Sequence, residues 1–399
     1  MNKYRLVDLF CGAGGLSLGF EQTGRFQIAG AMDHWNHAIN TFRHNHPELP
    51  ASSLINEDAN VIATAGFDDG IKSIWEEGGP VDVVVGGPPC QGLSLAGKRI
   101  TDDSRNQLFN AFVAGVAKLR PRAFVMENVP GLLSMKSGFL NTAIIDAFRE
   151  IGYRLFVDSA PLILKAEDYG VPQLRRRLFY VGFFDGVASR HFEWPPKPTH
   201  SSISTESNPA ITGQFGFDSR AFDNALEIVP TVREAISDLP IILSGEGRDE
   251  MDYPEQGAPL TPYQQLMRSG PINWTPRVYN HEAPGHTQKL IEMIQKAAPG
   301  ASVDPKYSDS KKWDPEKPGF TVKALGAGGG STNRRAFHYD PDTPRGSTAR
   351  ENARIQSFPD WFRFTGAKTH QMTQVGNAVP PLLAQAIAKS IACSLDASG

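Results

Sequence analysis

Short apolar runs alternate with amphipathic stretches through the first half of the chain. Continuous apolar runs are typical of strands buried on both faces, and a 3.6-residue period between them is typical of covering helices. The alternation therefore predicts an α/β fold in which a parallel sheet carries helices on both faces. We expect strands at residues 5–10, 27–32, 81–86, 123–127 and 178–184, and helices at residues 16–22, 38–45, 107–118 and 140–151.

The pattern changes after residue 186, where Pro, Ser, Thr and Gly become frequent, as in WPPKPTHSSISTESNP. Few long apolar periods occur before residue 355, which is typical of a smaller, loop-rich domain. A strong helical pattern returns at Pro381, because proline in the first helical turn lacks only an N–H that would be unpaired anyway. We therefore expect a main domain at residues 1–187, a second domain at 188–345, and a segment at 346–399 that returns to the first.

Net charge, cysteine spacing and the lack of long apolar runs limit the classes of protein to which the chain can belong. The formal net charge is −3, so any affinity for nucleic acid must come from local groups of Lys and Arg. The three cysteines lie far apart, which predicts neither a disulfide framework nor a Cys-x-x-Cys zinc site. No long apolar run and no signal-peptide pattern occurs, so we expect a cytoplasmic protein with no membrane partner. Candidate basic groups lie at residues 175–177, 311–312 and 334–335, and at Arg345, Arg350 and Arg354.

A glycine-rich turn follows the first predicted strand, in DLFCGAGGLSLGF. Glycines allow a ligand close to the backbone, and the free N–H groups of the next helix favour a polar or anionic one. The spacing departs from the dinucleotide fingerprint, since the sixth position from Gly12 is Ser17. Asp33 ends the second strand, where a carboxylate can accept hydrogen bonds from ribose hydroxyls, and Asp58 could accept one from an adenine amine. Together these features predict an adenosine site.

A further candidate for chemistry is Cys90, which follows two prolines after a predicted buried strand in VVVGGPPCQGLS. A free cysteine is most often a buried structural residue. Here the prolines stiffen the backbone, and the polar loop that follows includes Lys98 and Arg99, which favour a thiolate. The next strand carries Glu127 to the same edge of the sheet, so we expect the thiolate and this carboxyl group to face each other.

This pair of groups suits one chemistry in particular. No histidine lies close in sequence to Cys90 or Glu127, so the imidazole base that a cysteine protease needs is missing. Carbon 5 of cytosine is too weak a nucleophile to take a methyl group, but thiolate addition at carbon 6 makes it an enamine carbon that can attack. A carboxyl group bonded to ring nitrogen 3 stabilises the charge that this addition creates.

At this point the chain resembles the DNA (cytosine-5)-methyltransferase family, in particular its bacterial type II modification methylases. The resemblance rests on seven segments in the family's order from residue 8 to residue 381: DLFCGAGG, GGPPCQGLS, DSRNQLF, ENV, QLRRR, ARENARIQSFPDWF and QVGNAVPP. A chance match to all seven is not credible. Ala349 stands where the family often has proline, and Cys11 where alanine is frequent; neither touches the chemistry.

The resemblance implies a catalytic residue set. Cys90 is the implied nucleophile and Glu127 the residue that holds cytosine nitrogen 3, while Arg177 contacts the ring oxygen and Gln173 and Arg175 complete the Gln-x-Arg-x-Arg motif. The implied methyl donor is S-adenosyl-L-methionine, with no metal. Its implied pocket consists of Phe10, Gly12, Gly14, Gly15, Asp33, Asp58, Pro89, Asn377 and Val379.

The implied substrate is double-stranded DNA, from which the enzyme must flip the cytosine out of the stack. The loop after the cysteine is the predicted lid, and residues 188–345 correspond to a target-recognition domain. Within it, KALGAGGGSTNRRAF combines a glycine-rich loop with two arginines, which suits contact with guanine edges in a DNA groove or with phosphates. The predicted DNA contacts are Gln91, Ser94, Lys98, Arg99, Arg334 and Arg335.

Three other functions remain open on sequence. An RNA cytosine-5 methyltransferase would share the chemistry, but the long 190–340 segment favours duplex DNA. A DNA-binding homologue without catalysis would not need the cysteine and its partners, and a dehydrogenase would need the last fingerprint glycine. We expect a monomer, with a restriction endonuclease as a separate partner.

Overall fold

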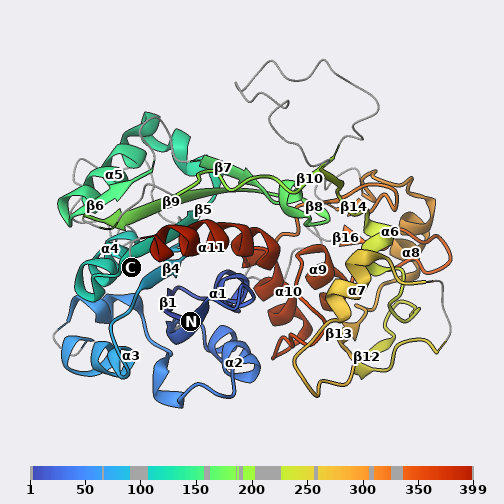
Figure 1. Cartoon of the computed structure of the whole chain (residues 1–399). Helices are drawn as coiled ribbons and strands as arrows, with labels where there is room; N and C mark the ends of the chain where they lie inside the picture. Colours follow the sequence, from blue (N-terminus) through green and yellow to red (C-terminus); the bar gives the residue numbers. More distant parts are fainter. Residues whose placement is uncertain are drawn as a thin grey trace.

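The computed structural model describes residues 3–64, 67–89, 107–156, 162–185, 187, 192–202, 226–255, 259–304, 310–324 and 336–397. Within them the predicted α/β architecture is confirmed: a central sheet carries helices on both faces (Figure 1). The sheet strands are β1 (Tyr4–Leu9), β2 (Phe26–Met32), β3 (Leu54–Ile55), β4 (Val83–Gly86), β5 (Ala123–Asn128), β6 (Tyr153–Leu155), β7 (Leu162–Lys165) and β9 (Arg176–Phe184).

The strand order is β3-β2-β1-β4-β5-β9-β6, with β7 also paired to β9. β1 to β5 are parallel, but β9 runs antiparallel to β5, β6 and β7. The expectation of a parallel sheet was therefore wrong at this edge. Only ten residues, 166–175, separate β7 from β9, which is short for the crossover that a parallel partner requires.

Two apolar clusters fill the two sides of the sheet. On one side, side chains such as Phe20, Phe42 and Ile387 bring α1 (Gly15–Glu21), α2 (Asn36–Asn45) and α11 (Pro381–Asp396) onto the strands. On the other, Trp75, Phe112 and Phe148 do the same for α3 (Ser73–Glu76), α4 (Gln107–Leu119) and α5 (Phe139–Glu150). Alternate strand residues serve the two clusters, as a sheet covered on both faces requires.

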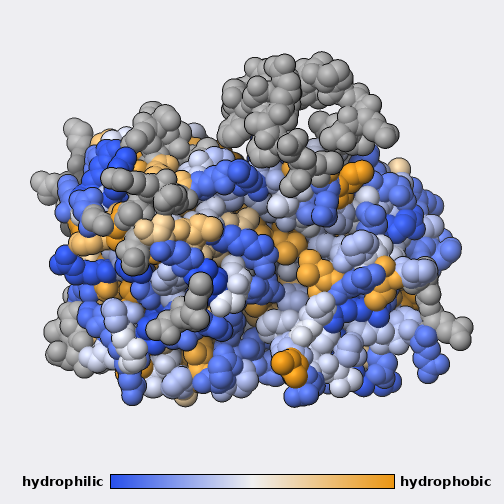
Figure 2. All heavy atoms as spheres, in the orientation of Figure 1, coloured by the Kyte–Doolittle hydropathy of each residue, from blue (hydrophilic) through white to orange (hydrophobic). Residues whose placement is uncertain are grey.

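The last helix packs tightly against the first. A Cβ at Gly19 of α1 would lie 2.4 Å from the Pro381 carbonyl oxygen, so only glycine permits this approach. By length and composition alone, the segment Lys368–Asp396 could cross a membrane, but 61% of an apolar 18-residue stretch within it is buried in the protein, as in a core helix. Figure 2 shows mostly hydrophilic side chains on the face over α11 and α1, with hydrophobic ones in small groups.

The remaining elements form the second region, to the right in Figure 1. A third apolar cluster joins it to the main sheet, since Leu18 of α1 packs in the same cluster as Phe358 and Val375. Its helices are α6 (Val232–Ile236), α7 (Pro262–Arg268), α8 (Gln288–Lys296), α9 (Ala349–Ile355) and α10 (Lys368–Asn377), and its strands are β8 (Gln173–Leu174), β10 (His200–Ser201), β11 (Glu227–Ile228), β12 (Gly247–Met251), β13 (Val278–Glu282), β14 (Lys311–Lys312), β15 (Gly319–Phe320) and β16 (Ala336–Phe337).

One predicted basic group proves to be structural. Arg345, Arg350 and Arg354 are at most 2% exposed, so they cannot form a surface for nucleic acid. Arg345 makes a two-pronged contact with Glu351, and Arg354 bonds both oxygens of Asp360 at 2.7 Å. Lys312, from another predicted basic group, is also buried.

Replacing Arg354 by methionine should lower the free energy of unfolding by about 3–5 kcal/mol, because the buried Asp360 and Asp238 would lose a partner. Urea titration followed by circular dichroism measures this. The control is Arg233→Met, whose pair with Glu316 is exposed and should be worth no more than about 1 kcal/mol. Equal losses in the two variants would contradict the structural role given to Arg354.

Candidate active site

Glu127 and Arg177 form an ion pair at the edge of the sheet where β5 ends. β5 and β9 are antiparallel neighbours, which brings Arg177 Nε to 2.8 Å from Glu127 Oε1. The Arg177 side chain is only 14% exposed, and the Glu127 side chain only 12%. Burial raises the pKa of Glu127, while the charges of Arg177 and Arg175 act in the opposite direction. The carboxyl group therefore takes up a proton more readily than an ordinary glutamate does, and in its protonated form it can donate a hydrogen bond.

The chain that leads to Cys90 lies against this pair. A Cβ added at Gly87 would be 2.9 Å from Glu127 Oε2, so the carboxylate touches the backbone after β4. Asn128 Nδ2 donates a 3.0 Å hydrogen bond to the Pro88 carbonyl oxygen in a buried position. The residues just before Cys90 are thus held beside Glu127 by the last two residues of β5.

Several predicted residues lie outside the described residues. Residues 90–106 and 325–335 are among the undescribed segments, and they include Cys90. The predicted DNA contacts Gln91, Ser94, Lys98, Arg99, Arg334 and Arg335 fall in the same two segments. Pro89 is the last described residue before the segment 90–106, and it is exposed.

The glycine-rich turn is strained and fixed by hydrogen bonds. Phe10 has φ +60°, a conformation that a bulky residue rarely adopts outside functional sites. The turn is held by Asp33, whose carboxylate accepts from the Gly12 and Trp35 backbone N–H groups at 2.9 and 2.8 Å. A Cβ at Gly12 would meet nothing within 4 Å, so open space adjoins this turn. A strand-end carboxylate beside an open glycine turn fits an adenosine-containing ligand.

Two other glycines of this turn serve packing. A Cβ at Gly15 would lie 2.4 Å from the Val379 carbonyl oxygen, and one at Gly14 would lie 2.9 Å from the Phe42 ring. Gly15 therefore lets α1 approach the segment that follows α10. Val379 is buried in this contact, while Asn377 at the end of α10 is exposed.

Asp58 and Trp35 lie on segments that follow β3 and β2. Asp58 begins the 3-10 helix Ala59–Ala63 and accepts a 2.9 Å hydrogen bond from Asn60 N. Trp35 was not predicted; it is half-buried, and its ring packs edge-on against His37 and His370. An aromatic residue two positions after a strand-end acid is the signal that could have pointed to it.

Gln173 and Arg175 are fully buried, unlike Arg177. Gln173 bonds Ile355 O and Val322 N, which ties β8 to the second region. Arg175 donates to the carbonyl oxygens of Gly376 and Ala378 at 3.0 and 2.9 Å, on both sides of Asn377. Gln173 and Arg175 are fully enclosed, so they are placed to position neighbouring segments, whereas the Arg177 side chain is 14% exposed and remains accessible to a ligand.

Asp8, near the end of β1, is a further buried acid that sequence reasoning left without a role. It is 1% exposed, and its Oδ2 has no hydrogen-bond partner among the described residues. Burial raises its pKa to about 7, while hydrogen bonds with Ser17 of α1 act in the opposite direction. Asp8 therefore lies beneath the start of α1, and its carboxyl group is still largely protonated as the pH approaches 7.

Replacing Asp8 by asparagine should remove part of the pH dependence of stability. Folded Asp8 keeps its proton up to pH about 7, whereas its ordinary pKa is 3.8, so the free energy of unfolding falls as pH rises between these values. This loss amounts to about 4 kcal/mol in total. In urea titrations from pH 4 to 8, the free energy of unfolding of the variant should rise relative to that of the original protein by about 4 kcal/mol. A constant difference across the range would refute the assignment.

Comparisons with known proteins agree with this geometry. The sequence matches the family described as C-5 cytosine-specific DNA methylase over residues 4–393. It is 36% identical to the type II methyltransferase M.DdeI of Desulfomicrobium norvegicum, covering 97% of this chain and 88% of that protein. It is 33% identical to M.AgeI of Thalassovita gelatinovora, also a type II methyltransferase, covering 97% and 99%.

Solved structures give the same result for the fold. A structure described as a prophage-encoded DNA modification methyltransferase from E. coli has a TM-score of 0.73 and 28% identity, with 98% of each chain covered. DNMT2 of Spodoptera frugiperda, at 14% identity and a TM-score of 0.58, shares the fold over 98% of this chain. With the Glu127–Arg177 pair beside Gly87 and Pro88, these matches establish that the chain belongs to the C-5 cytosine-specific DNA methylase family and is a DNA (cytosine-5-)-methyltransferase.

Proposed function

We propose that this chain transfers a methyl group from S-adenosyl-L-methionine to carbon 5 of a cytosine flipped out of duplex DNA, through a covalent bond between Cys90 and carbon 6. The observation that carries the proposal is the buried Glu127–Arg177 pair, against which the backbone leading to Cys90 is packed. A carboxyl group with a raised pKa and a fixed guanidinium group suit the pairing edge of one pyrimidine.

The proposed reaction begins when the Cys90 thiolate forms a bond to carbon 6. The electron pair of the 5,6 double bond moves into the ring, where a hydrogen bond from Glu127 to nitrogen 3 stabilises the new charge. Arg177 holds the ring oxygen in a forked contact. Carbon 5 would then take the methyl group, with S-adenosyl-L-homocysteine as the leaving product, and would lose its proton to a base. The returning electron pair would expel the Cys90 thiolate.

The donor site would be the glycine turn with its strand-end acids. S-adenosyl-L-methionine supplies an electrophilic methyl group when it is bound. Asp33 would accept from the ribose while it holds the turn, since a carboxylate offers more acceptor positions than the two backbone bonds use. Asp58 and Phe10 would contact the adenine, and Asn377 would face the same space from the end of α10. Pro89 and Val379 would complete the pocket.

The remaining parts of the proposal concern the substrate and its setting. Residues 1–187 would be the catalytic domain and 188–345 the target-recognition domain. The segment 346–399 would return to the catalytic domain through α11, which packs on α1, while α9 and α10 pack with the second region. The loop after Cys90 would close over the flipped base and exclude water. We further propose a cytoplasmic monomer that modifies one DNA sequence, with a restriction endonuclease acting separately, as the type II names of the relatives suggest.

The test is a methylation assay with a tritiated donor and either plasmid DNA or total transfer RNA. We expect label in DNA only, and bisulfite sequencing of the plasmid should place it at one cytosine within one sequence. Label only in RNA would overturn the substrate assignment in favour of an RNA methyltransferase. Donor binding without label in either would favour a DNA-binding homologue that has lost catalysis.

A further inference from the structure

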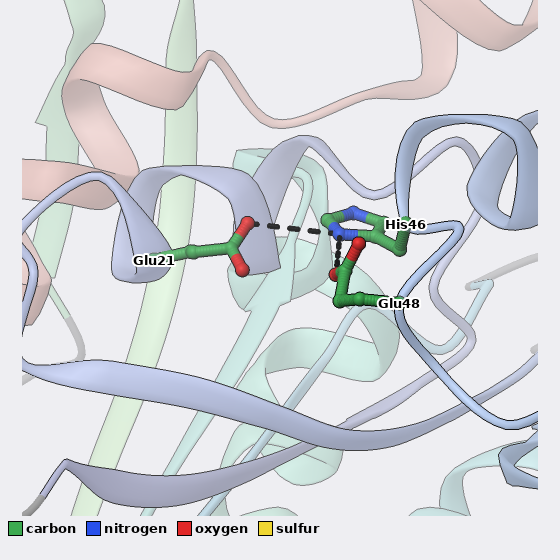
Figure 3. Close-up of side chains that lie close together, drawn as sticks. All are labelled: Glu21, His46 and Glu48. Atoms are coloured by element: carbon green, nitrogen blue, oxygen red, sulfur yellow. Dashed lines mark ion pairs between the residues drawn. The ribbon is translucent and has the colours of Figure 1, made fainter. Parts of the chain in front are cut away.

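Three side chains with metal-binding atoms meet where α1 and α2 end, away from the active site. Glu21 is the last residue of α1, His46 directly follows α2, and Glu48 lies two residues further on. Figure 3 shows both carboxylates directed at one ring nitrogen of His46. His46 Nδ1 lies 3.6 Å from Glu21 Oε2 and 3.5 Å from Glu48 Oε1. Among the described residues, this is the only such cluster of three.

The distances favour a shared ion over direct hydrogen bonds. N–H···O bonds span about 2.7–3.2 Å, so both separations are too long for good ones. Two ligands that hold one tetrahedral ion at about 2.1 Å each lie roughly 3.4 Å apart, which is close to what is observed. The two nitrogen–oxygen separations thus match the spacing of ligand atoms around one cation, and all three ligand atoms lie within 4.8 Å of one another.

The environment of His46 adds an independent observation. Its ring is 1% exposed and packs against Phe42 at 4.6 Å between ring centres, so its orientation is fixed. The second ring nitrogen, Nε2, is buried with no hydrogen-bond partner among the described residues. A neutral ring bound to an ion through Nδ1 would carry its one proton on Nε2, as an imidazolium also does, so the unpaired Nε2 is common to both states. A neutral ring that uses Nδ1 as a metal ligand avoids placing a net charge in that apolar contact.

We propose that Glu21, His46 and Glu48 bind one divalent cation of the zinc class. One imidazole nitrogen with two carboxylates suits Zn²⁺, whereas Mg²⁺ and Ca²⁺ prefer oxygen ligands alone. Two carboxylates and a neutral imidazole balance the charge of the ion. The competing assignment is a protonated His46 paired with two glutamates, which would require no metal.

The ion would act as a brace between two helices. α1 begins at the glycine turn, and α2 begins just after Asp33 and Trp35, so a clamp at their far ends would fix both sides of that turn. It takes no part in methyl transfer and does not depend on the proposed function. The sequence predicted no metal, so this proposal departs from that expectation; it leaves the chemistry of the active site unchanged.

The experiment uses the full-length protein after chelator treatment and dialysis. Isothermal titration with Zn²⁺ should give one saturable site, and the melting temperature should rise by several degrees because the ion binds only the folded state. Mg²⁺ at the same concentration should give neither effect. Glu21→Gln and Glu48→Gln alter partly exposed side chains, so both variants should fold; each should weaken zinc binding at least about tenfold.

Glu150→Gln, which changes an exposed glutamate at the end of α5, is the matched control and should bind zinc unchanged. No saturable zinc binding would overturn the proposal in favour of the imidazolium pair. Equal binding in all variants would also overturn it, because the zinc would then be held elsewhere. Binding of S-adenosyl-L-methionine is measured in parallel; its loss with intact zinc binding would count against the proposed function and not against the ion site.

Discussion

Replacing Cys90 by serine should reduce methyl transfer at least about 10³-fold, while binding of the methyl donor stays close to that of the original protein. A hydroxyl group is not ionised at neutral pH and adds poorly to carbon 6, so carbon 5 is never activated. The donor site is formed by other residues, chiefly the glycine turn and Asp33. Single-turnover assays with labelled donor give the rate, and calorimetry gives the donor affinity.

Cys393→Ser is the matched control for this variant. Cys393 is exposed on α11, so its replacement should leave both the fold and the rate unchanged. Full activity of Cys90→Ser would refute covalent catalysis by this residue. Loss of donor binding together with activity would indicate instead that the substitution disturbs the fold.

Replacing Glu127 by glutamine should lower the rate by about 10²–10⁴-fold. The amide keeps the shape of the side chain. It can neither transfer a proton to ring nitrogen 3 nor form an ion pair with Arg177. The raised pKa of Glu127 also predicts a readout beyond the rate. In the original protein the rate should fall as rising pH removes this proton, and the variant should lack that limb of the pH profile.

Glu150→Gln serves as the control here too, since this exposed glutamate lies outside the pair. Donor affinity should be unchanged in both variants, which separates an effect on the chemistry from an effect on binding. A rate for Glu127→Gln within about twofold of the original would contradict the role proposed for the buried carboxyl group.

The sheet was predictable from sequence in its parallel part. Runs such as residues 83–86, VVVG, are apolar throughout because helices cover both faces, and the structure places β4 there with no exposed residue. The direction of β9 was not predictable, because an apolar run has the same periodicity in either orientation. Three helices of the second region did carry a readable signal, since Thr231, Thr261 and Thr348 each begin a capping box with the residue three positions later.

The candidate site was predictable where chemistry follows a strand end, as for Asp33 and Glu127. The burial of basic residues was not predictable. Arg345, Arg350 and Arg354 have the spacing of a basic surface group, yet each is enclosed by carboxylates or backbone carbonyls. Contacts between distant segments were equally hidden. His46 meets Glu21 only because α1 and α2 pack side by side, and no pattern in the sequence links these two positions.

The most direct test of the covalent route is to trap it. A duplex that carries 5-fluorocytosine at the target base cannot release a proton from carbon 5, so the bond to carbon 6 should persist after methyl transfer. Mass spectrometry of the digested complex should then find the oligonucleotide attached to Cys90. Absence of any adduct under conditions where normal DNA is methylated, or attachment at another residue, would contradict the mechanism.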